Sequence, residues 1–422
     1  MNILVVGSGA REHALVTALK ADESVGLIIC APGNAGIARD VQTRDVDATS
    51  AQAIADLAAE LAVDLVVIGP EVPLVAGAAD AVRARGIACF GPSAAAAQLE
   101  GSKAFAKQVM DEAGVDTARA RVCRVMDEVA EALDEFGAPH VVKDDGLAAG
   151  KGVVVTDDRD EALAHARVCL SRGGDARVVI EEYLDGPEVS LFGITDGTTI
   201  IALEPAQDFK RAYDGDAGPN TGGMGAYSPL PWAPATLVAD VTERVLQPMI
   251  DRMRERGTPF VGLLYAGLAL TARGTRVIEF NARFGDPETQ VVLARLASPL
   301  GQVLLAAATG TLAALPPLAW REGAAVTVVI ASKGYPESPV TGDVISGLDE
   351  AGAIEGVTVL HAGTRATDAG IVSAGGRVLS VTAQGESLAL ARSSAYEAVD
   401  LISIDGAHHR SDIAAGAAAQ AD

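Results

Sequence analysis

The chain has 422 residues, enough for about three domains of ordinary size. Hydrophobic residues make up 49% and charged residues 21% of it, which excludes a disordered chain and allows sizeable cores. Lys and Arg number 33 against 56 Asp and Glu, so the net charge is −23. That balance argues against a protein that binds nucleic acid or an anionic membrane through a basic surface.

Cysteine usage and hydropathy indicate the compartment. The four cysteines are scattered without CxxC spacing, which favours a reduced protein over a zinc site or a disulfide framework. The apolar run at residues 1–6 is too short for a signal peptide. No run approaches the roughly 18 apolar residues of a membrane span. We therefore expect a cytoplasmic protein with no nucleic-acid or membrane partner.

The first 100 residues alternate apolar runs of strand length with Ala- and Leu-rich helical patterns. This alternation predicts a parallel sheet with helices on its faces. The expected strands are residues 3–6, 26–30, 64–68 and 87–90, and the expected helices are 12–20, 51–61 and 74–85. Ligands of such sheets bind at the carboxyl ends of the strands. Three suitable loops follow strands there, at residues 7–13, 32–36 and 69–71.

The first of these loops only partly fits a dinucleotide-binding motif. Glu12 stands where GxGxxG requires its third glycine, and Cys30 stands where an acidic ribose ligand is required, so an NAD(P) site is disfavoured. Gly7 and Gly9 still allow backbone N–H groups to approach an anion at a helix N-terminus, where Arg11 adds charge. The alternative is a tight strand-to-helix turn without a ligand.

A second candidate is a glycine hairpin at residues 143–152. Lys143 ends an expected strand at 139–142, and a small-residue loop containing Gly150-Lys151-Gly152 leads into an expected strand at 153–156. Such a loop lets backbone N–H groups close over phosphates while the lysines neutralise charge. It is not a Walker A loop, because Gly152 occupies the Ser or Thr position. A hairpin without a ligand is the alternative.

Further charged residues lie at the ends of expected elements. Ser102 is expected to cap a helix that begins at Lys103, which is either an exposed helix lysine or a phosphate contact. An expected strand at 178–184 carries Glu181 and Glu182. These carboxylates are suited to accept hydrogen bonds from an adenine amino group or ribose hydroxyls, although a solvated strand end is the more common outcome.

A long, glycine-dense segment follows. Residues 218–229 have no periodicity, and loops of this kind in compact domains are usually functional or disordered. Its aromatic residues and Met224 argue against disorder. A helix is then expected at 236–256 and a strand at 262–271.

The strand at residues 276–280 carries a candidate metal site. Alternation places Glu279, Asn281 and Arg283 on one side, with Ile278 and Phe280 towards a core. A carboxylate and an amide oxygen two residues apart are hard ligands of the kind that Mg²⁺ takes beside water and substrate phosphates. The alternative is an edge strand with a solvated polar face.

Few chemical motifs lie beyond this strand. Asp286 and Pro287 are typical of a helix N-cap and first helical position. From residue 324 the pattern indicates strands and loops with a final helix at 388–402, and residues 414–422 are expected to be frayed. His361 is isolated, and a lone histidine is more often structural than catalytic.

Together, the lysines, the glycine hairpin and the oxygen-ligand strand form an ATP and Mg²⁺ site without a P-loop. The sequence resembles the phosphoribosylamine–glycine ligase family of the ATP-grasp superfamily. The matching stretches span nearly the whole chain in order: GSGAREHAL (7–15), APGNAG (31–36), GPEVPLV (69–75), FGPSAAAAQLEGSKAF (90–105), DGLAAGKGV (145–153), GPNTGGMGAYSP (218–229), LYAGL (264–268), IEFNARFGDPETQ (278–290) and GDVISGL (342–348).

The resemblance implies a mixed α/β fold in three parts. These are an N-terminal parallel α/β domain for phosphoribosylamine (1–100), an ATP-grasp α+β domain (101–310) with a mobile small subdomain at about 120–190, and a C-terminal α+β domain (324–413) with a flexible tail (414–422). The implied reaction joins glycine to 5-phosphoribosylamine at the expense of ATP, through a glycyl phosphate, in de novo purine biosynthesis. A monomer is expected.

The resemblance also implies residue roles. The metal, Mg²⁺ or Mn²⁺, is held by Glu279 and Asn281. The ATP-binding residues are Lys103, Lys143, Gly150, Lys151, Gly152, Glu181, Glu182 and Glu188. The catalytic residues are Lys143, Arg283 on the glycyl phosphate and Asp208 on the glycine ammonium group. The substrate-binding residues are Gly9, Arg11, Glu12, Asn34, Glu71, Asp208, Lys210, Asn220 and Arg283.

Two positions depart from the family pattern. Asp144 stands where a small residue is usual, and Phe209 where histidine is frequent. The extra acid would weaken phosphate affinity at Lys143 unless it points away. Two alternatives are another ATP-grasp carboxylate–amine ligase, which the stretches at 7–71 and 218–229 argue against, and a silent nucleotide-binding protein, which the intact Lys143 and Glu279 argue against.

Overall fold

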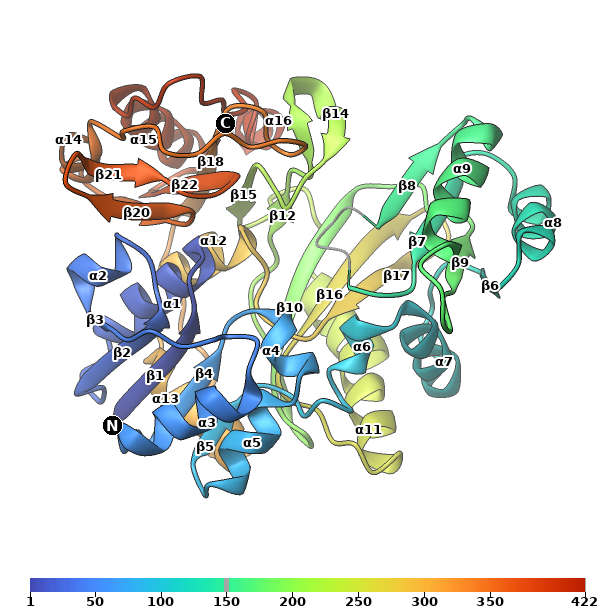
Figure 1. Cartoon of the computed structure of the whole chain (residues 1–422), viewed down its shortest axis with the longest axis horizontal. Coiled ribbons are helices and arrows are strands. Elements are labelled where there is room, and N and C mark those ends of the chain that lie inside the picture. Colours follow the sequence, from blue (N-terminus) through green and yellow to red (C-terminus); the bar gives the residue numbers. More distant parts are fainter. Residues whose placement is uncertain (148–151, 422) are drawn as a thin grey trace.

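The computed structural model describes residues 1–147 and 152–421. In Figure 1 the N-terminal domain (blue) lies at the lower left and the C-terminal domain (red) at the upper left, with the central strands β10, β16 and β17 beside them. A small subdomain built around β6–β9 projects at the right. Within the described ranges, no helix is both long and apolar enough to cross a membrane.

The N-terminal domain is the predicted parallel sheet, with strand order β3-β2-β1-β4-β5. Its strands are β1 (Asn2–Gly7), β2 (Leu27–Pro32), β3 (Gln42–Thr43), β4 (Leu65–Ile68) and β5 (Ala88–Phe90). Its helices are α1 (Ala10–Lys20), α2 (Ile37–Asp40), α3 (Ala51–Glu60), α4 (Glu71–Val75) and α5 (Ala78–Ala84). The single helix expected at 74–85 is wrong, because Gly77 adopts a left-handed conformation (φ 86°) between α4 and α5.

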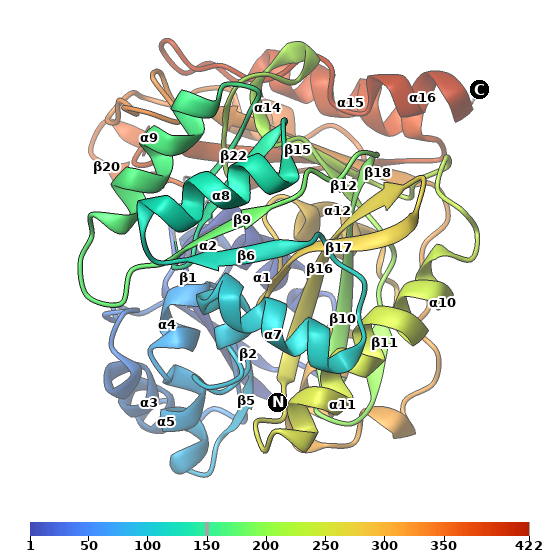
Figure 2. The same cartoon turned by 90° about the vertical axis from the view of Figure 1, so that its right-hand side faces the viewer.

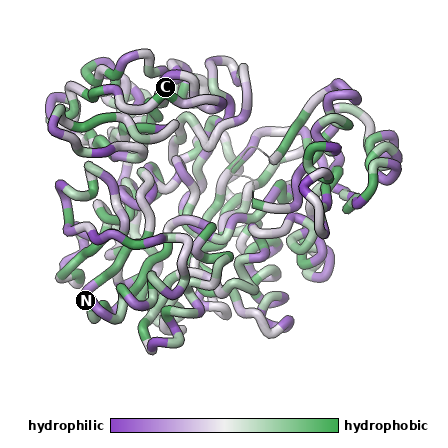
Figure 3. Tube along the Cα trace, viewed as in Figure 1, coloured by the Kyte–Doolittle hydropathy of each residue, from purple (hydrophilic) through white to green (hydrophobic). Residues whose placement is uncertain are grey.

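Both faces of this sheet are covered, which explains why its strands are continuous apolar runs. Leu4 and Val66 pack with Ile54 of α3 on one face. On the other face, Ile3 packs with helices α1 and α13 (Leu300–Thr309), the latter from much later in the chain. Figure 3 shows hydrophobic residues along these strands. The N-terminal sheet therefore shares a core with the ATP-grasp segment.

The ATP-grasp segment forms two antiparallel sheets. One has the order β11-β10-β16-β17, and the small subdomain has β6-β9-β7-β8 with α8 and α9 packed on it in a core of its own (Figure 2). The strands are β6 (Ala120–Cys123), β7 (His140–Asp144), β8 (Val153–Thr156), β9 (Val178–Glu181), β10 (Glu188–Asp196), β11 (Ile200–Ala202), β16 (Val261–Thr271) and β17 (Gly274–Asn281). The helices are α6 (Gln98–Gly101), α7 (Lys103–Ala113), α8 (Met126–Phe136), α9 (Arg159–Leu170), α10 (Leu237–Val241), α11 (Gln247–Glu255) and α12 (Glu288–Arg295).

The C-terminal sheet has the order β12-β15-β18-β22-β19. Its strands are β12 (Gln207–Asp208), β15 (Gly225–Ser228), β18 (Ala324–Ala331), β19 (Val357–His361) and β22 (Arg377–Gly385). Beside it lie the hairpins β13 (Arg211–Tyr213)–β14 (Ala217–Asn220) and β20 (Thr364–Thr367)–β21 (Gly370–Ser373), with helices α14 (Leu348–Gly352), α15 (Leu388–Leu401) and α16 (Ala415–Ala421).

Two expectations fail in this region. The glycine-dense segment is not an unpaired loop, because β15 pairs with β18 about a hundred residues later, with Ala226 opposite Thr327. The end of the chain is not frayed over residues 415–421, because helix α16 buries Ala417 and Ala418 in the core that contains α15.

His361, at the end of β19, joins the C-terminal domain to the N-terminal domain. Its backbone N–H donates to Nδ1 of His13 (2.8 Å), and Nε2 of His13 contacts Oδ2 of Asp40 (2.8 Å). Asn34 donates from Nδ2 to the His361 carbonyl (2.8 Å). Burial, with the nearby His13 and Arg39, lowers the pKa of His361 from 6.5 to about 4.

This burial predicts a dependence of stability on pH. The unfolded chain takes up a proton at His361 before the folded chain does, so stability is lost as the pH falls from 6.5 towards 4. Between pH 7 and 4.5 the wild type is expected to lose about 2–3 kcal/mol of unfolding free energy more than His361→Gln. Urea unfolding at both pH values measures this, with the exposed His409→Gln as control. Equal losses in all three proteins would contradict it.

Candidate active site

Strand β17 carries the predicted metal ligands, but its alternation is interrupted. The pairing with β16 shifts between Gly267 and Leu268, so that Ile278 is bulged. Val277 and Phe280 are therefore the core residues, and Ile278 is only half-buried. The prediction that Ile278 shares the core face with Phe280 is wrong for this reason.

Glu279 and Asn281 present oxygen atoms that no described residue uses. Neither side chain hydrogen-bonds within residues 1–147 and 152–421. Burial alone would raise the pKa of Glu279, but the positive charges of Lys210, Lys143 and Lys103 outweigh it and lower the pKa. An ionised carboxylate beside an amide oxygen suits Mg²⁺, which keeps several waters and binds through one or two protein oxygens plus substrate phosphates. Among the described residues, no group of three His, Cys, Asp or Glu could hold a metal by itself.

Glu181 lies between two lysines. Its carboxylate accepts from Lys143 Nζ at Oε2 (2.7 Å) and from Lys107 Nζ at Oε1 (2.8 Å). Lys143 also donates to the Ile278 carbonyl of β17 (3.1 Å), which ties the small subdomain to the metal strand. Lys107 was missed in the sequence analysis, although it stands one helical turn after Lys103 on α7.

The other two carboxylates predicted for adenosine have different partners. Glu182 turns away from Glu181 and pairs with Arg119 (3.1 Å) and Arg273 (3.3 Å). Glu188, at the start of β10, pairs with Lys210. Of the three carboxylates, Glu181 alone contacts a predicted phosphate lysine, Lys143, among the described residues.

The base of the hairpin packs on the start of α7. Ser102 caps this helix as predicted, accepting from Phe105 N (3.1 Å). Asp145 accepts from Ala104 N (2.7 Å), and Lys103 Nζ donates to the Gly146 carbonyl (3.3 Å). Gly150 and Lys151 lie outside the described residues.

The departure at Asp144 does not place its charge beside Lys143. The Asp144 carboxylate pairs with Arg172, and successive strand residues point to opposite faces. The acid therefore points away from the lysine, which is the condition under which phosphate affinity is kept.

Arg283 lies between two carboxylates. Its guanidinium contacts Glu71 Oε2 (3.1 Å) and Glu100 Oε1 (2.8 Å). Glu100 also accepts from the Ala282 N–H (2.7 Å), so it fixes the turn after β17. Glu100 was missed because nothing in its local sequence distinguishes it from an ordinary helix residue. These contacts bring Glu71 to the end of the metal strand.

The Gly7–Gly9 turn already holds an anion of the protein itself. The Glu12 carboxylate accepts from Gly9 N (2.6 Å) and from Arg11 Nε (2.6 Å). A Cβ at Gly69 would lie 1.9 Å from Glu12 Oε1, and one at Gly7 would lie 2.6 Å from Glu12 Cγ. The expectation that the Gly9 N–H is open to an external anion is therefore wrong, because Glu12 occupies it.

Asn34 and Asn220, two predicted substrate residues, have structural contacts. The Asn34 amide donates to the carbonyls of Ser8 (2.9 Å) and His361 (2.8 Å), and its Oδ1 accepts from the N–H groups of Gly36 and Ile37 (both 2.9 Å). The backbone of Asn220 lies opposite that of Arg211 in the antiparallel β13–β14 hairpin.

Asp208 and Lys210 lie beside a buried cluster that the sequence analysis missed. Tyr265 OH donates to Glu288 Oε1 (2.8 Å), and Ser190 Oγ contacts both of these groups. Burial raises the pKa of Asp208 to about 7, with Glu288 adding to the effect and Lys210 opposing it. Asp208 is thus poised to ionise near neutral pH when a cation approaches.

The start of α12 also differs from the prediction. Pro287, not Asp286, occupies the N-cap position, and no side chain caps the helix there. Asp286 instead accepts from Gln290 Nε2 (2.8 Å) and pairs with Arg377 of β22 (3.3 Å). Arg377 also donates to the carbonyls of Gly222 and Asp286. These bonds join the C-terminal domain to the glycine-dense segment and to the turn before α12.

Comparison with known proteins assigns the three parts of the chain. Family descriptions for phosphoribosylglycinamide synthetase match the N domain at residues 1–100, the ATP-grasp (A) domain at 101–289 and the C domain at 325–416. A phosphoribosylamine–glycine ligase of Streptomyces coelicolor is 64% identical over 99% of this chain and 100% of its own. The crystal structure of the Thermotoga maritima phosphoribosylamine–glycine ligase has a TM-score of 0.84 at 32% identity, covering 98% of this chain and 100% of that one.

A more distant structure shares only the fold. A biotin carboxylase of Campylobacter jejuni, solved with an ATP analogue, has a TM-score of 0.74 at 16% identity, covering 97% of this chain and 92% of its own.

The position of the Glu12 carboxylate predicts that no side chain larger than that of glycine is tolerated at position 69. In Gly69→Ala the new methyl group displaces the carboxylate from its donors, so the unfolding free energy should fall by about 1–3 kcal/mol. Urea unfolding measures this. Gly352→Ala, in helix α14 with no atom within 4 Å of the new Cβ, is the control and should be neutral or stabilising. Equal stability of the two variants would refute the steric argument.

Proposed function

The chain belongs to the phosphoribosylamine–glycine ligase family, and on that premise we propose how its residues divide the reaction. ATP, glycine and 5-phosphoribosylamine give ADP, phosphate and glycinamide ribonucleotide in purine biosynthesis. We assign phosphoribosylamine binding to residues 1–100 and ATP binding to residues 101–310, with a closing subdomain at about 120–190. The C-terminal domain (324–413) supports residues 208–229, which we call the substrate segment.

One observation carries the assignment of the chemistry. Glu279 and Asn281 offer oxygen ligands on β17, and Lys143, Lys103 and Lys210 lie close enough to lower the Glu279 pKa. A site that combines a hard-metal ligand pair with several lysines suits a nucleoside triphosphate and its divalent cation. A bound Mg²⁺ or Mn²⁺ would neutralise charge on the transferring phosphoryl group.

The protein's own groups position the two reacting molecules. Lys143 and Lys103 neutralise ATP phosphates. Lys143 then exchanges Glu181 for a phosphate, and Glu181 keeps Lys107 at Oε1 and has Oε2 available for the adenosine. Glu188 and the residues 150–152 complete the nucleotide site. A carboxylate is a weak acceptor of a phosphoryl group, so in-line positioning and charge neutralisation supply most of the catalysis.

Separate residues hold glycine and phosphoribosylamine, and the amine must reach the carbonyl carbon of the glycyl phosphate, from which it displaces phosphate. Asp208 takes the glycine ammonium group, with Lys210 beside it, and Arg283 steadies the glycyl phosphate. Arg11, Glu12, Asn34 and Glu71 hold phosphoribosylamine. All four have partners within the protein, as in the Arg11–Glu12 and Arg283–Glu71 pairs, so the substrate must replace these contacts or add to them.

Omission of single substrates tests the proposed reaction. ADP release should require both glycine and phosphoribosylamine, the latter generated in the assay because it is unstable. Turnover that is unaffected by leaving out glycine would overturn the assignment. Turnover with another amino acid or amine in place of these substrates would indicate a different carboxylate–amine ligase.

The metal assignment predicts a large effect at one carboxylate. Glu279→Gln should lower kcat by at least about 100-fold, the scale of losing a charge that holds the metal. Glu255→Gln is the matched control, since that exposed carboxylate pairs with Arg252 on helix α11, and it should stay within a few-fold of wild type. Near-normal turnover of Glu279→Gln at saturating Mg²⁺ would remove Glu279 from the metal site.

The glycine assignment predicts a pH profile. Only the ionised Asp208 attracts an ammonium group, and burial raises its pKa to about 7, so kcat/KM for glycine should fall about tenfold per pH unit below that value. Asp208→Asn should raise the glycine KM and flatten this limb of the profile. Asp185→Asn, in an exposed turn before β10, should keep the wild-type profile. An unchanged limb in Asp208→Asn would assign the titration to another group.

A further inference from the structure

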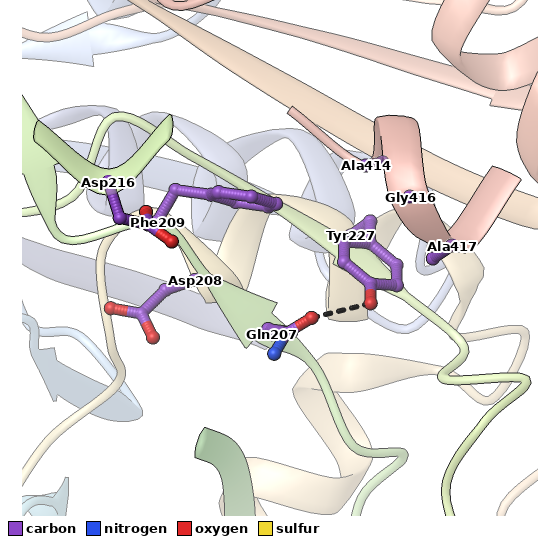
Figure 4. Close-up of a pocket in the computed structure, with 8 residues that line it drawn as sticks. All are labelled: Gln207, Asp208, Phe209, Asp216, Tyr227, Ala414, Gly416 and Ala417. Atoms are coloured by element: carbon purple, nitrogen blue, oxygen red, sulfur yellow. Dashed lines mark hydrogen bonds between the residues drawn. The ribbon is translucent and has the colours of Figure 1, made fainter. Parts of the chain in front are cut away.

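The segment that carries Asp208 and Lys210 has a second face, occupied by Phe209. Because strand residues alternate, the Phe209 side chain points opposite to its two neighbours. Figure 4 shows the Phe209 ring directed towards the Tyr227 side of the hollow and the Asp208 carboxylate directed away from it. The backbone of Phe209 bonds to the glycine-dense segment, accepting from Met224 N (2.7 Å) and donating to the Gly225 carbonyl (3.0 Å).

Arg410, from the C-terminal domain, lies on this second face. Its Cζ is 4.9 Å from the centre of the Phe209 ring, within the range of a cation–π contact. Its side chain is 1% exposed, although it carries a full charge. Such a buried cation requires several partners to be stable.

Those partners hold Arg410 rigidly. Asp412 accepts two hydrogen bonds from Nε and Nη2 (both 2.7 Å), a geometry that fixes the guanidinium plane. Nη1 donates to Asp216 Oδ1 (2.8 Å) and to the Arg211 carbonyl (3.2 Å), both in the segment that follows Lys210. Arg410 therefore contacts the substrate segment through the ring of Phe209 and through its backbone.

The Phe209 ring is partly buried against the core, and the centre of the Tyr227 ring is 6.2 Å from its own centre. A hollow of about 230 Å³ lies beside it, lined by Tyr227 and by Ala414, Gly416 and Ala417 at the end of the chain (Figure 4). The ring thus has open space on one side, and the guanidinium is its fixed neighbour on another.

We infer that Arg410 is a positioning residue, which acts through Phe209 to set the place of Asp208 and Lys210 and thereby the affinity for glycine. The C-terminal domain then contributes to amino-acid binding without touching the amino acid. This inference rests on the proposed function of Asp208.

Steady-state kinetics of variants at the contact test this role. Phe209→Leu removes the π face and keeps an apolar side chain, and it should raise the glycine KM about fivefold, the scale of a lost cation–π contact. The KM values for ATP and phosphoribosylamine and the kcat at saturating glycine should stay within about twofold. Phe209→Tyr keeps the ring and should restore the wild-type glycine KM.

A second pair of variants separates positioning from general loosening of the C-terminal domain. Arg410→Lys keeps the charge but not the planar, bidentate group, so it should raise the glycine KM as Phe209→Leu does. Ser387→Ala is the control that loosens the C-terminal domain elsewhere. Ser387 caps helix α15 by accepting from Leu390 N (3.2 Å), so its loss weakens this domain without removing a contact to Phe209 or Arg410. It should leave the glycine KM unchanged.

The outcomes are distinct. A glycine KM unchanged in Phe209→Leu, or raised equally in Ser387→Ala, overturns the positioning role. A rise in all three KM values together overturns it as well, because it would report general loosening. An unchanged glycine KM in Asp208→Asn overturns instead the proposed role of Asp208, so the two failures are told apart.

Discussion

The candidate site depends on one electrostatic constraint, which is that its lysine and arginine side chains must be stabilised although they lie close together and largely away from water. They do so in a chain whose net charge is −23. A buried cation is costly unless it has a counter-charge and hydrogen bonds. Most of the site's cations have an internal carboxylate: Lys143 has Glu181, Lys210 has Glu188, Arg283 has Glu71 and Glu100, and Arg11 has Glu12. Lys103 instead donates to the Gly146 carbonyl. A substrate phosphate or carboxylate binds favourably in this site when it takes over the contacts that a lysine or arginine makes with its internal carboxylate.

Ion pairs of the candidate site also join the domains, so the same residues contribute to stability and to the site. Arg283 joins the end of β17 to Glu71 of the N-terminal domain, and Arg377 joins the C-terminal domain to Asp286. These interdomain ion pairs thus lie within the candidate site.

Much of the fold could be predicted, because its signals are local. Strands β1, β2 and β4 are each predicted by their own apolar residues, and the start of α7 is predicted by Ser102, which bonds to a residue three positions later. The errors come from contacts between distant segments. Strand β15 exists because β18 pairs with it, and the bulge at Ile278 depends on the register with β16. For the same reason Lys107, Glu100 and Arg410 were missed, since each acts on a residue far away in the chain.

The central claim is that the polar face of β17 places the metal, and with it the phosphoryl group. The most direct measurement is an anomalous difference map of crystals grown with Mn²⁺ and ADP. The account predicts a Mn²⁺ peak at about 2.2 Å from a Glu279 carboxylate oxygen and the Asn281 amide oxygen, the distance expected for a hard divalent cation. A peak bound by Asp208 and Glu188, with Glu279 and Asn281 uncoordinated, would contradict it.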